Sequence, residues 1–418
     1  MPSNPLFWIM PQSSQPCSRS VPRTVLRHYQ PKTARGLYSL GLSAMIAAVK
    51  EEALMADSVR DVLAGIATVE EMTAAFQDED HCRRLLEAMV WPRGRICPAC
   101  GYRCSTALAG RDVGRQARPG LYQCSNGLCR FQFTVTTRTP LHSTKLPLRV
   151  WLTGLWLILQ SDKGISSVRL AEAIGVSQPT AWRMGHALRL LVTREQQLGG
   201  TVEIDELYIG GSPRRDADRP RLGRGRKGQP RTTKTPILAV VQRPEQLHDG
   251  ARAGAAGARV VNDLSEREAW RVLSETVDPS AHLMSDEWKS FMSVGQAFAA
   301  HDTVRHCERE YARGPVHANS VEGFNDRVRR TIAGVFHHIS SHHADLYFNE
   351  IGFRWSQRVM TGSAVRRTRR GRKVVKPLWR RIPPALQLAN VFKSAVGRQL
   401  RRTAQGGIQI QCTVAVFG

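Results

Sequence analysis

The sequence predicts an α/β protein in which a region of alternating strands and helices follows a cysteine-rich module and a helical segment. Over residues 200–358, short apolar alternations typical of strands are interleaved with helical patterns. Five cysteines fall within residues 97–129, and residues 146–198 repeat apolar side chains at helical spacing. The chain has 418 residues. That length is enough for about three domains, each with its own core.

The composition excludes several classes of protein. Hydrophobic residues make up 42% of the chain, which argues against a wholly disordered or collagen-like protein. The longest apolar stretch, residues 150–159, is too short to cross a bilayer, so a transmembrane protein is excluded as well. Sixty Lys and Arg against 35 Asp and Glu give a net charge of +25. This charge predicts a polyanionic partner. Nucleic acid is the first candidate, and an anionic membrane surface is the second.

The ends of the chain differ from its middle. Residues 1–65 stay unassigned, either as a disordered segment or as an extension of the gene model, and residues 66–92 have a helical pattern. The insert at 212–235 is rich in Arg, Gly and Pro and is expected to be an exposed basic loop. Residues 359–418 contain no Asp or Glu, and 15 Arg and Lys lie between 354 and 402. We expect this part to be a basic tail, most simply a solvated polycation.

Clustered cysteines predict a structural zinc site in residues 93–140. Cys97 and Cys100 form one C-x-x-C pair, and Cys124 and Cys129 form a second pair that 23 residues separate from the first. Two such knuckles supply the four thiolates of a closed tetrahedral Zn²⁺ site, which leaves no open position for chemistry. Cys104 could replace Cys100, and five ordinary buried thiols are the rival interpretation. No secretory signal is visible, so we expect a reducing compartment, the cytoplasm.

The segment from Lys163 to Trp182 has the spacing of a helix-turn-helix. Ser166 can cap a first helix, Gly175 can supply the positive φ of the turn, and Ser177 can cap a second helix. A plain helical hairpin between two domains is the alternative. In the helix-turn-helix interpretation, the early part of the second helix enters a major groove of DNA. The residues expected to contact DNA there are Gln178, Thr180 and Arg183.

Acidic residues in the α/β region predict a metal-dependent site. Asp205 lies on the expected strand 201–209, and Asp286 lies on the expected strand 281–288. Glu322 would face both from a helix that begins near residue 320. Three carboxylates held together stay ionised only if cations neutralise them, as in a two-metal phosphoryl-transfer site. Asn319 lies one helical turn before Glu322 and can support or replace it, while Arg329 lies two turns after it and can contact a phosphate.

Taken in order, these motifs resemble a known family. A zinc ribbon, a helix-turn-helix, VEIDELYIGG, SDEWKSF and HANSVEGFNDRVRRTIAGVFHHIS occur in sequence. This order resembles the bacterial insertion-sequence transposases of the ISXO2-like type, which have an N-terminal zinc ribbon and a DDE-type, ribonuclease-H-like catalytic domain with a mixed sheet. The resemblance covers roughly residues 68–358. It implies that Asp205 and Asp286 are the first two catalytic acids and that Glu322 or Asn319 is the third. The family usually has lysine where this chain has Arg329.

The resemblance also implies an activity and its partners. It implies Mg²⁺ or Mn²⁺ as the catalytic metal, nicking and strand transfer at terminal inverted repeats, and a target DNA duplex. A homodimer or larger synaptic complex is expected, located at the bacterial nucleoid with no membrane contact. Three rivals remain: a DNA-binding regulator with inert acids, a nuclease without strand transfer, and a decayed copy. Metal-dependent cleavage and joined products discriminate between them.

Overall fold

The computed structural model describes residues 61–108, 119–194, 196–210, 234–367, 371, 373–392, 395–402 and 408–412. Residues 1–60 of the unassigned segment 1–65 lie outside these ranges, and so does the expected basic loop at 212–235 apart from residues 234 and 235. No helix in the described ranges is long and apolar enough to cross a membrane.

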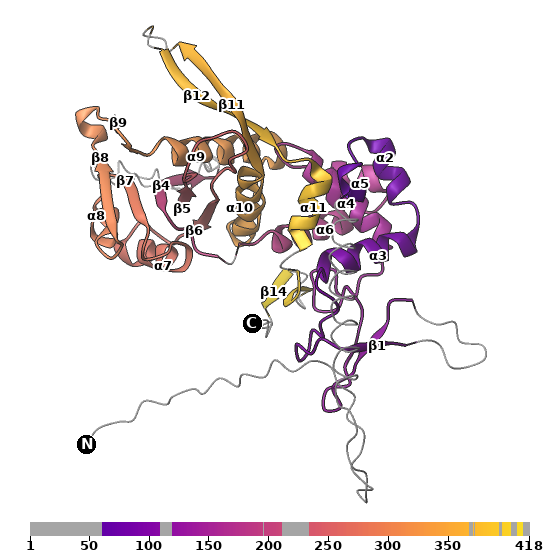
Figure 1. The fold of residues 1–418 in the computed structure, drawn as a ribbon. Coiled ribbons are helices and arrows are strands. Elements are labelled where there is room, and N and C mark those ends of the chain that lie inside the picture. The colour runs from indigo at the N-terminus through magenta and orange to yellow at the C-terminus, as the bar shows by residue number, and fades with distance from the viewer. Residues whose placement is uncertain are drawn as a thin grey trace, which may run out of the picture.

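In the described part of the chain, the N-terminal body is a group of helices and a small sheet that share one core (Figure 1). Thr68 forms a capping box with Glu71 at the start of the first helix. Trp156, Leu152 and Phe133 are among the fully buried side chains of this core. Its elements are α2 (Val69–Ala75), α3 (Glu79–Val90), β1 (Ser105–Ala107), β2 (Tyr122–Cys124), β3 (Gln132–Phe133), α4 (Leu148–Gln160), α5 (Ser167–Ile174) and α6 (Gln178–Leu191).

The second part of the chain forms a five-stranded mixed sheet of order β6-β5-β4-β7-β8. β4 pairs antiparallel with β5 and parallel with β7, and β7 pairs parallel with β8. The expected strand 201–209 is confirmed residue for residue, while the expected strand 281–288 is shorter. The elements are β4 (Thr201–Ile209), β5 (Thr235–Gln242), β6 (Ala256–Val260), α7 (Glu266–Thr276), β7 (His282–Asp286), α8 (Lys289–Gly295) and β8 (Ala300–Val304).

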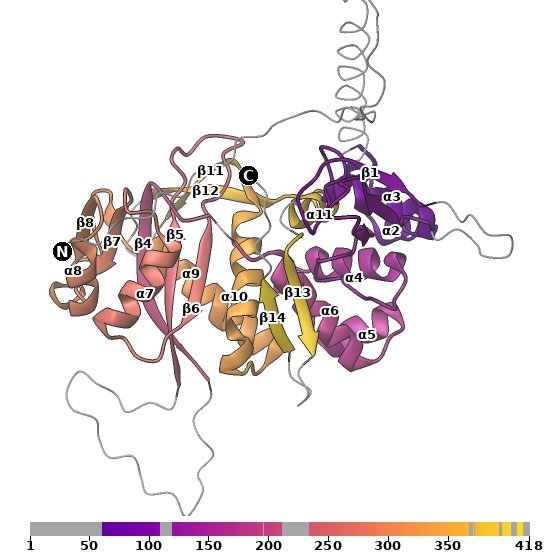
Figure 2. The ribbon, with the colours of Figure 1, turned by 90° about the horizontal axis from the view of Figure 1, so that it is seen from below.

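Helices cover both faces of this sheet, as Figures 1 and 2 show. On one face, Val202, Ile204 and Leu283 pack in a common core with α7 and α8. On the other face, Leu207 and Ile237 pack against α9 and α10. The elements that follow β8 are η1 (His306–Glu308), β9 (Ala312–Arg313), β10 (Val316–His317), α9 (Asn319–Thr331), the π-helical turn η2 (Ile332–Phe336) and α10 (Ser341–Ser356). This arrangement is a mixed α/β domain, in agreement with the predicted fold class.

The C-terminal segment differs from the solvated tail that its charge suggested. A long antiparallel hairpin is followed by a helix and a second hairpin. The helix buries Leu388, Val391 and Phe392 in the N-terminal core and packs on α4. These apolar residues recur at helical spacing, a pattern that the surrounding arginines obscure. The elements are β11 (Arg358–Arg367), β12 (Lys373–Arg381), α11 (Pro384–Phe392), β13 (Arg398–Arg402) and β14 (Ile408–Cys412).

Candidate catalytic and zinc sites

The four cysteines predicted to bind zinc come together in the N-terminal body. The sulfur atoms of Cys97 and Cys129 are 3.8 Å apart, and those of Cys100 and Cys124 are 3.6 Å apart. All four sulfurs lie within 4.8 Å of one another. Thiolates bound to Zn²⁺ at about 2.3 Å in a tetrahedron are separated by roughly 3.8 Å, so the cluster has the size that zinc requires.

Tight turns present these thiolates. At the first knuckle, the Gly101 N–H donates to the Cys97 carbonyl, and Gly101 adopts a φ of 74° that favours glycine. Strand β2 supplies Cys124, and the three strands β1, β2 and β3 form one antiparallel sheet around the site. The cluster contains Cys100 and not Cys104, as the preferred C-x-x-C spacing predicted.

The two aspartates predicted as catalytic acids also lie together, because adjacent parallel strands carry them. The pairing of β4 with β7 matches Thr201 to His282 and ends with Glu203 opposite Met284. Two residues further along each strand stand Asp205 and Asp286. Since side chains two apart on a strand share a face, both aspartates point to the side of the sheet that α9 covers.

Two further side chains complete this acidic site. Carboxylate oxygens of Asp205, Glu206 and Asp286 all lie within 4.8 Å of one another. From α9, the side-chain Nδ2 of Asn325 donates a 2.7 Å hydrogen bond to Asp205 Oδ2. Glu206 Oε2 and Asn325 Oδ1 are buried and have no hydrogen-bond partner within the described part of the chain. Unpaired hard oxygen atoms beside three carboxylates are the donor set that Mg²⁺ or Mn²⁺ binds.

The electrostatics of this site favour a cation. Burial, reinforced by the neighbouring charges of Glu206 and Asp286, raises the pKa of Asp205 to about 7. Burial also raises the pKa of Glu206 and of Asp286 above their ordinary values. Such shifts arise when carboxylates crowd together without a counter-ion, and a divalent cation reverses them by stabilising the ionised forms.

A second carboxylate fixes α9 against the sheet. Glu203, fully buried on β4, accepts hydrogen bonds from the Ser320 and Val321 N–H groups at 2.6 and 2.9 Å. It is also paired with the guanidinium of Arg243. A carboxylate at a helix N-terminus satisfies free N–H groups and complements the helix dipole. Glu203 therefore holds α9 in the position from which Asn325 reaches Asp205.

The structure places the other predicted site residues on α9 but outside the acid cluster. Asn319 and Glu322 stand on the first turn of the helix and are exposed. Neither belongs to the group of carboxylates that meet where the middle of β4 lies beside the end of β7. Arg329 is exposed one turn beyond Asn325, and its positive charge offsets part of the rise that burial causes in the pKa of Glu206.

The predicted DNA-contacting residues lie on α6. Helix α5 ends at Gly175, which has a φ of 67°, and α6 begins two residues after Val176. Gln178 is exposed at the start of α6 and donates to Ser167 Oγ at 2.7 Å, and the Thr180 hydroxyl lies 2.9 Å from that of Ser177. Arg183 is half-buried and donates to the Leu400 carbonyl of β13 at 3.4 Å. Two helices and a turn are present as expected, and the guanidinium of Arg183 contacts the C-terminal segment.

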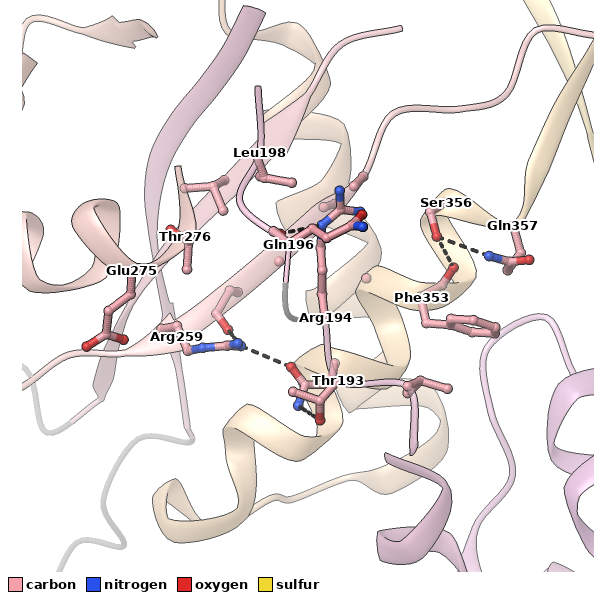
Figure 3. Close-up of a pocket in the computed structure, with 18 of the residues that line it drawn as sticks. Thr193, Arg194, Gln196, Leu198, Arg259, Glu275, Thr276, Phe353, Ser356 and Gln357 are labelled. Atoms are coloured by element: carbon pink, nitrogen blue, oxygen red, sulfur yellow. Dashed lines mark hydrogen bonds between the residues drawn. The ribbon is translucent and has the colours of Figure 1, made fainter. Parts of the chain in front are cut away.

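A cavity of about 490 Å³ lies elsewhere, where the end of α6 meets β6 and α10 (Figure 3). Thr193, Arg194 and Arg259 are among its lining residues, and Arg259 donates to Asn349 at 3.0 Å across one wall. None of the clustered acids lines this cavity. The acid cluster, and not this cavity, is therefore the candidate catalytic site, because its carboxyl groups have shifted pKa values.

Sequence reasoning missed Glu206 and Asn325. Strand alternation assigns Glu206 to the face opposite Asp205, but pairing with β7 ends before this point and lets both carboxylates meet. Asn325 had a usable signal, since it lies three residues after Glu322 on the expected helix. The packing of α9 against β4 is what brings the Asn325 amide to Asp205.

Comparisons with known proteins agree with this geometry. Residues 197–356 match the family model described as ISXO2-like transposase domain, and residues 77–132 match the one described as transposase zinc-ribbon domain. The first match spans the acidic site, and the second spans all four clustered cysteines. A relative from Halobacterium salinarum, named as an uncharacterized protein in transposable element ISH50, is 26% identical over 266 residues. The alignment covers 62% of this chain and 84% of the relative. The chain therefore contains an ISXO2-like transposase domain preceded by a transposase zinc-ribbon domain.

Proposed function

We propose that this protein binds the terminal inverted repeats of an insertion sequence and catalyses phosphodiester hydrolysis followed by strand transfer. The single observation that supports this most is the convergence of Asp205, Glu206 and Asp286 on the adjacent strands β4 and β7. Two Mg²⁺ or Mn²⁺ ions would be held by Asp205 and Asp286, which offer hard oxygen ligands on one face of the sheet. Such ions supply an activated hydroxyl and charge stabilisation at the leaving oxygen.

The residues of this chain have separate roles in that proposal. Asn325 helps to fix the rotamer of Asp205, because its amide donates to Oδ2 while the Glu206 backbone N–H donates to Oδ1 at 2.9 Å. Glu206 adds a third carboxylate. Arg329, exposed beside the acids, contacts a phosphate of the bound strand. Glu322, or Asn319 in its place, is the third acid implied by the family resemblance, and it stands on the helix that Glu203 anchors.

DNA would be held by the preceding parts of the chain. The N-terminal residues of α6, Gln178 and Thr180, are available for the major groove, and Arg183 adds positive charge nearby. The zinc ribbon would orient the N-terminal body on the element end. Two copies of the chain would bring two ends together in a synaptic homodimer, and the protein would act at the nucleoid in the cytoplasm.

Cleavage and joining of a labelled duplex that carries the flanking element ends tests the proposal. We expect the full chain to nick the duplex and form joined product in Mg²⁺ or Mn²⁺ but not in EDTA. Asp286→Asn should reduce both products by at least about 10³-fold, because it removes a negative metal ligand. Asp326→Asn is the matched control, since Asp326 is an exposed acid of α9 that pairs with Arg330.

Each other outcome assigns a different function. Specific binding of the ends without any cutting would contradict the catalytic proposal and favour a regulator or a decayed copy. Cutting without joined product would indicate a nuclease. Glu322→Gln and Asn319→Ala belong in the same experiment. If only Glu322→Gln abolishes cutting, Glu322 is the third acid. If both variants cut normally, the third ligand is Glu206.

A further inference from the structure

The hairpin formed by β11 and β12 extends away from the body of the molecule (Figure 1). In the described part of the chain, its two strands pack mainly against each other. The cross-strand pair Val365 and Val375 is left 64% and 66% exposed. Hairpins without a third strand or a covering helix are marginally stable in water. The hairpin therefore exposes apolar surface at Val365 and Val375 that packing of its two strands does not cover.

The outer half of the hairpin carries a positive charge that nothing in the segment offsets. Arg366, Arg367, Lys373 and Lys376 are all exposed. Arg367 lies directly opposite Lys373 in the register, a pairing of like charges that repels. No Asp or Glu occurs anywhere between residues 351 and 418. This repulsion weakens the isolated hairpin, and a polyanion bound against the hairpin would offset it.

These cations are distributed over both faces of the ribbon. Because strand side chains alternate, Arg367 and Lys373 share the face of Val365, while Arg366 and Lys376 lie on the opposite face. A ribbon that inserts into a groove meets a phosphate strand on each side, and the major groove of B-DNA, about 12 Å wide, admits a two-stranded ribbon. Positive charge on both faces of the ribbon therefore fits the groove of duplex DNA better than it fits a partner with one flat surface.

The base of the hairpin is attached firmly to the catalytic domain. The Arg358 guanidinium stacks on the Trp355 ring with its carbon 4.0 Å from the centroid, and Trp355 packs edge-on against Phe324 of α9. Met360 exchanges two 2.8 Å backbone hydrogen bonds with the loop at residues 250 and 251. DNA held on the outer hairpin would therefore be held relative to the helix that borders the acidic site.

We propose that the β11–β12 hairpin is an arm that binds duplex DNA through its phosphates, independently of sequence and in addition to the N-terminal body. The inference rests on the proposed DNA-directed function and adds to it a second contact surface. Arg366, Arg367, Lys373 and Lys376 carry the contact. A second copy of this chain is the other occupant that such an arm could have, and the test separates the two.

Equilibrium binding of the full chain to a random-sequence 40-base-pair duplex over a range of salt concentrations tests the arm. In the arm variant, Arg366, Arg367, Lys373 and Lys376 are all changed to Gln. Each lost phosphate contact should make the plot of log affinity against log salt shallower by roughly 0.9, so we expect a decrease in slope of about 3 to 4. Affinity near 100 mM salt should fall at least about tenfold.

A matched variant controls for net charge. Arg84, Arg267, Arg305 and Arg309 are exposed on other elements, and changing all four to Gln removes the same charge. Arg84 and Arg305 already lie beside acidic side chains, so this variant should change the slope by less than about 1. Equal slopes for the two variants would overturn the proposal. So would a dimer that dissociates in the arm variant while DNA affinity stays at the wild-type value, because the arm would then bind a second copy.

Two checks separate this inference from the proposed catalysis. The arm variant should melt at the same temperature as the wild type or slightly higher, since it loses the repelling Arg367–Lys373 pair. Asp286→Asn should keep the full salt slope because the arm does not depend on the acids. A chain that fails to cut its ends but shows the expected slopes would refute the catalytic proposal alone. Normal cutting with unchanged slopes would refute the arm alone.

Discussion

His186 on α6 is buried in a way that makes it sensitive to acid. Its side chain is fully buried, and neither ring nitrogen has a hydrogen-bond partner within the described residues. Trp182 from α6 and His343 and Tyr347 from α10 surround the ring. Burial lowers the pKa of His186 to about 2, and the nearby charges of Arg189 and His343 act in the same direction. The imidazole of His186 is therefore neutral at every pH at which the protein stays folded.

This burial predicts a loss of stability in mild acid. The unfolded chain takes up a proton at His186 below about pH 6.5, whereas the folded chain does not, so stability falls as pH decreases through that value. Between pH 8 and pH 5 the loss should be about 2 kcal/mol. His186→Leu should remove this part of the pH dependence. Chemical denaturation at several pH values measures it, with the exposed His248→Gln as control. An unchanged pH dependence in His186→Leu would disprove the assignment.

At the acidic site, the sequence predicted the residues that strand geometry controls. Asp205 and Asp286 were predictable because strand alternation and parallel pairing place them together without further information. Asn325 and Glu206 depend on how α9 lies on the sheet and on where the pairing with β7 ends. Local residue spacing encodes neither the placement of α9 on the sheet nor the point where the pairing with β7 ends. Tertiary contacts such as Glu203 with the start of α9 determine them.

Among the elements, the zinc ribbon makes the most definite prediction. Purified protein should contain one zinc ion per chain, because four thiolates lie at the separations of a tetrahedral site. Cys124→Ser should lose the metal and loosen the ribbon, where Trp91 packs edge-on against Tyr122 and Phe133. Elemental analysis and limited proteolysis measure both effects. Cys307→Ser, an exposed cysteine outside the cluster, is the control, and zinc retained by Cys124→Ser would contradict the site.

Element prediction succeeded where periodicity was strong and failed where charge dominated composition. Strand β4 was expected at 201–209, which are the observed bounds, because apolar alternation defines it. The C-terminal segment was expected to be solvated, yet α11 contributes Phe392 and Leu388 to the N-terminal core. A short apolar helix among many arginines gains its stability from distant packing partners, which local composition does not reveal.

At the scale of the whole molecule, a buried ion-pair network connects the N-terminal body to the sheet domain. Glu350 of α10 accepts from Arg189 Nε of α6 at 2.8 Å and from Arg354 at 2.7 Å. Arg354 also donates to the Ile158 carbonyl of α4 at 2.6 Å. Burial alone would raise the pKa of Glu350, but the two guanidinium groups hold it below its usual value. The network therefore contains a charged carboxylate shared between the two halves.

Because both arginines depend on it, Glu350 should couple the unfolding of the two halves. Glu350→Gln leaves two buried guanidinium groups without a counter-charge and should lower the free energy of unfolding by about 3–5 kcal/mol. In calorimetry, we expect one transition in the wild type and two in the variant, since the body and the sheet domain have separate cores. Glu275→Gln, at an exposed position, should change stability by no more than about 0.5 kcal/mol. If Glu350→Gln instead behaves like Glu275→Gln, the halves are held together by apolar packing such as that of Leu346, and the ion pairs contribute little.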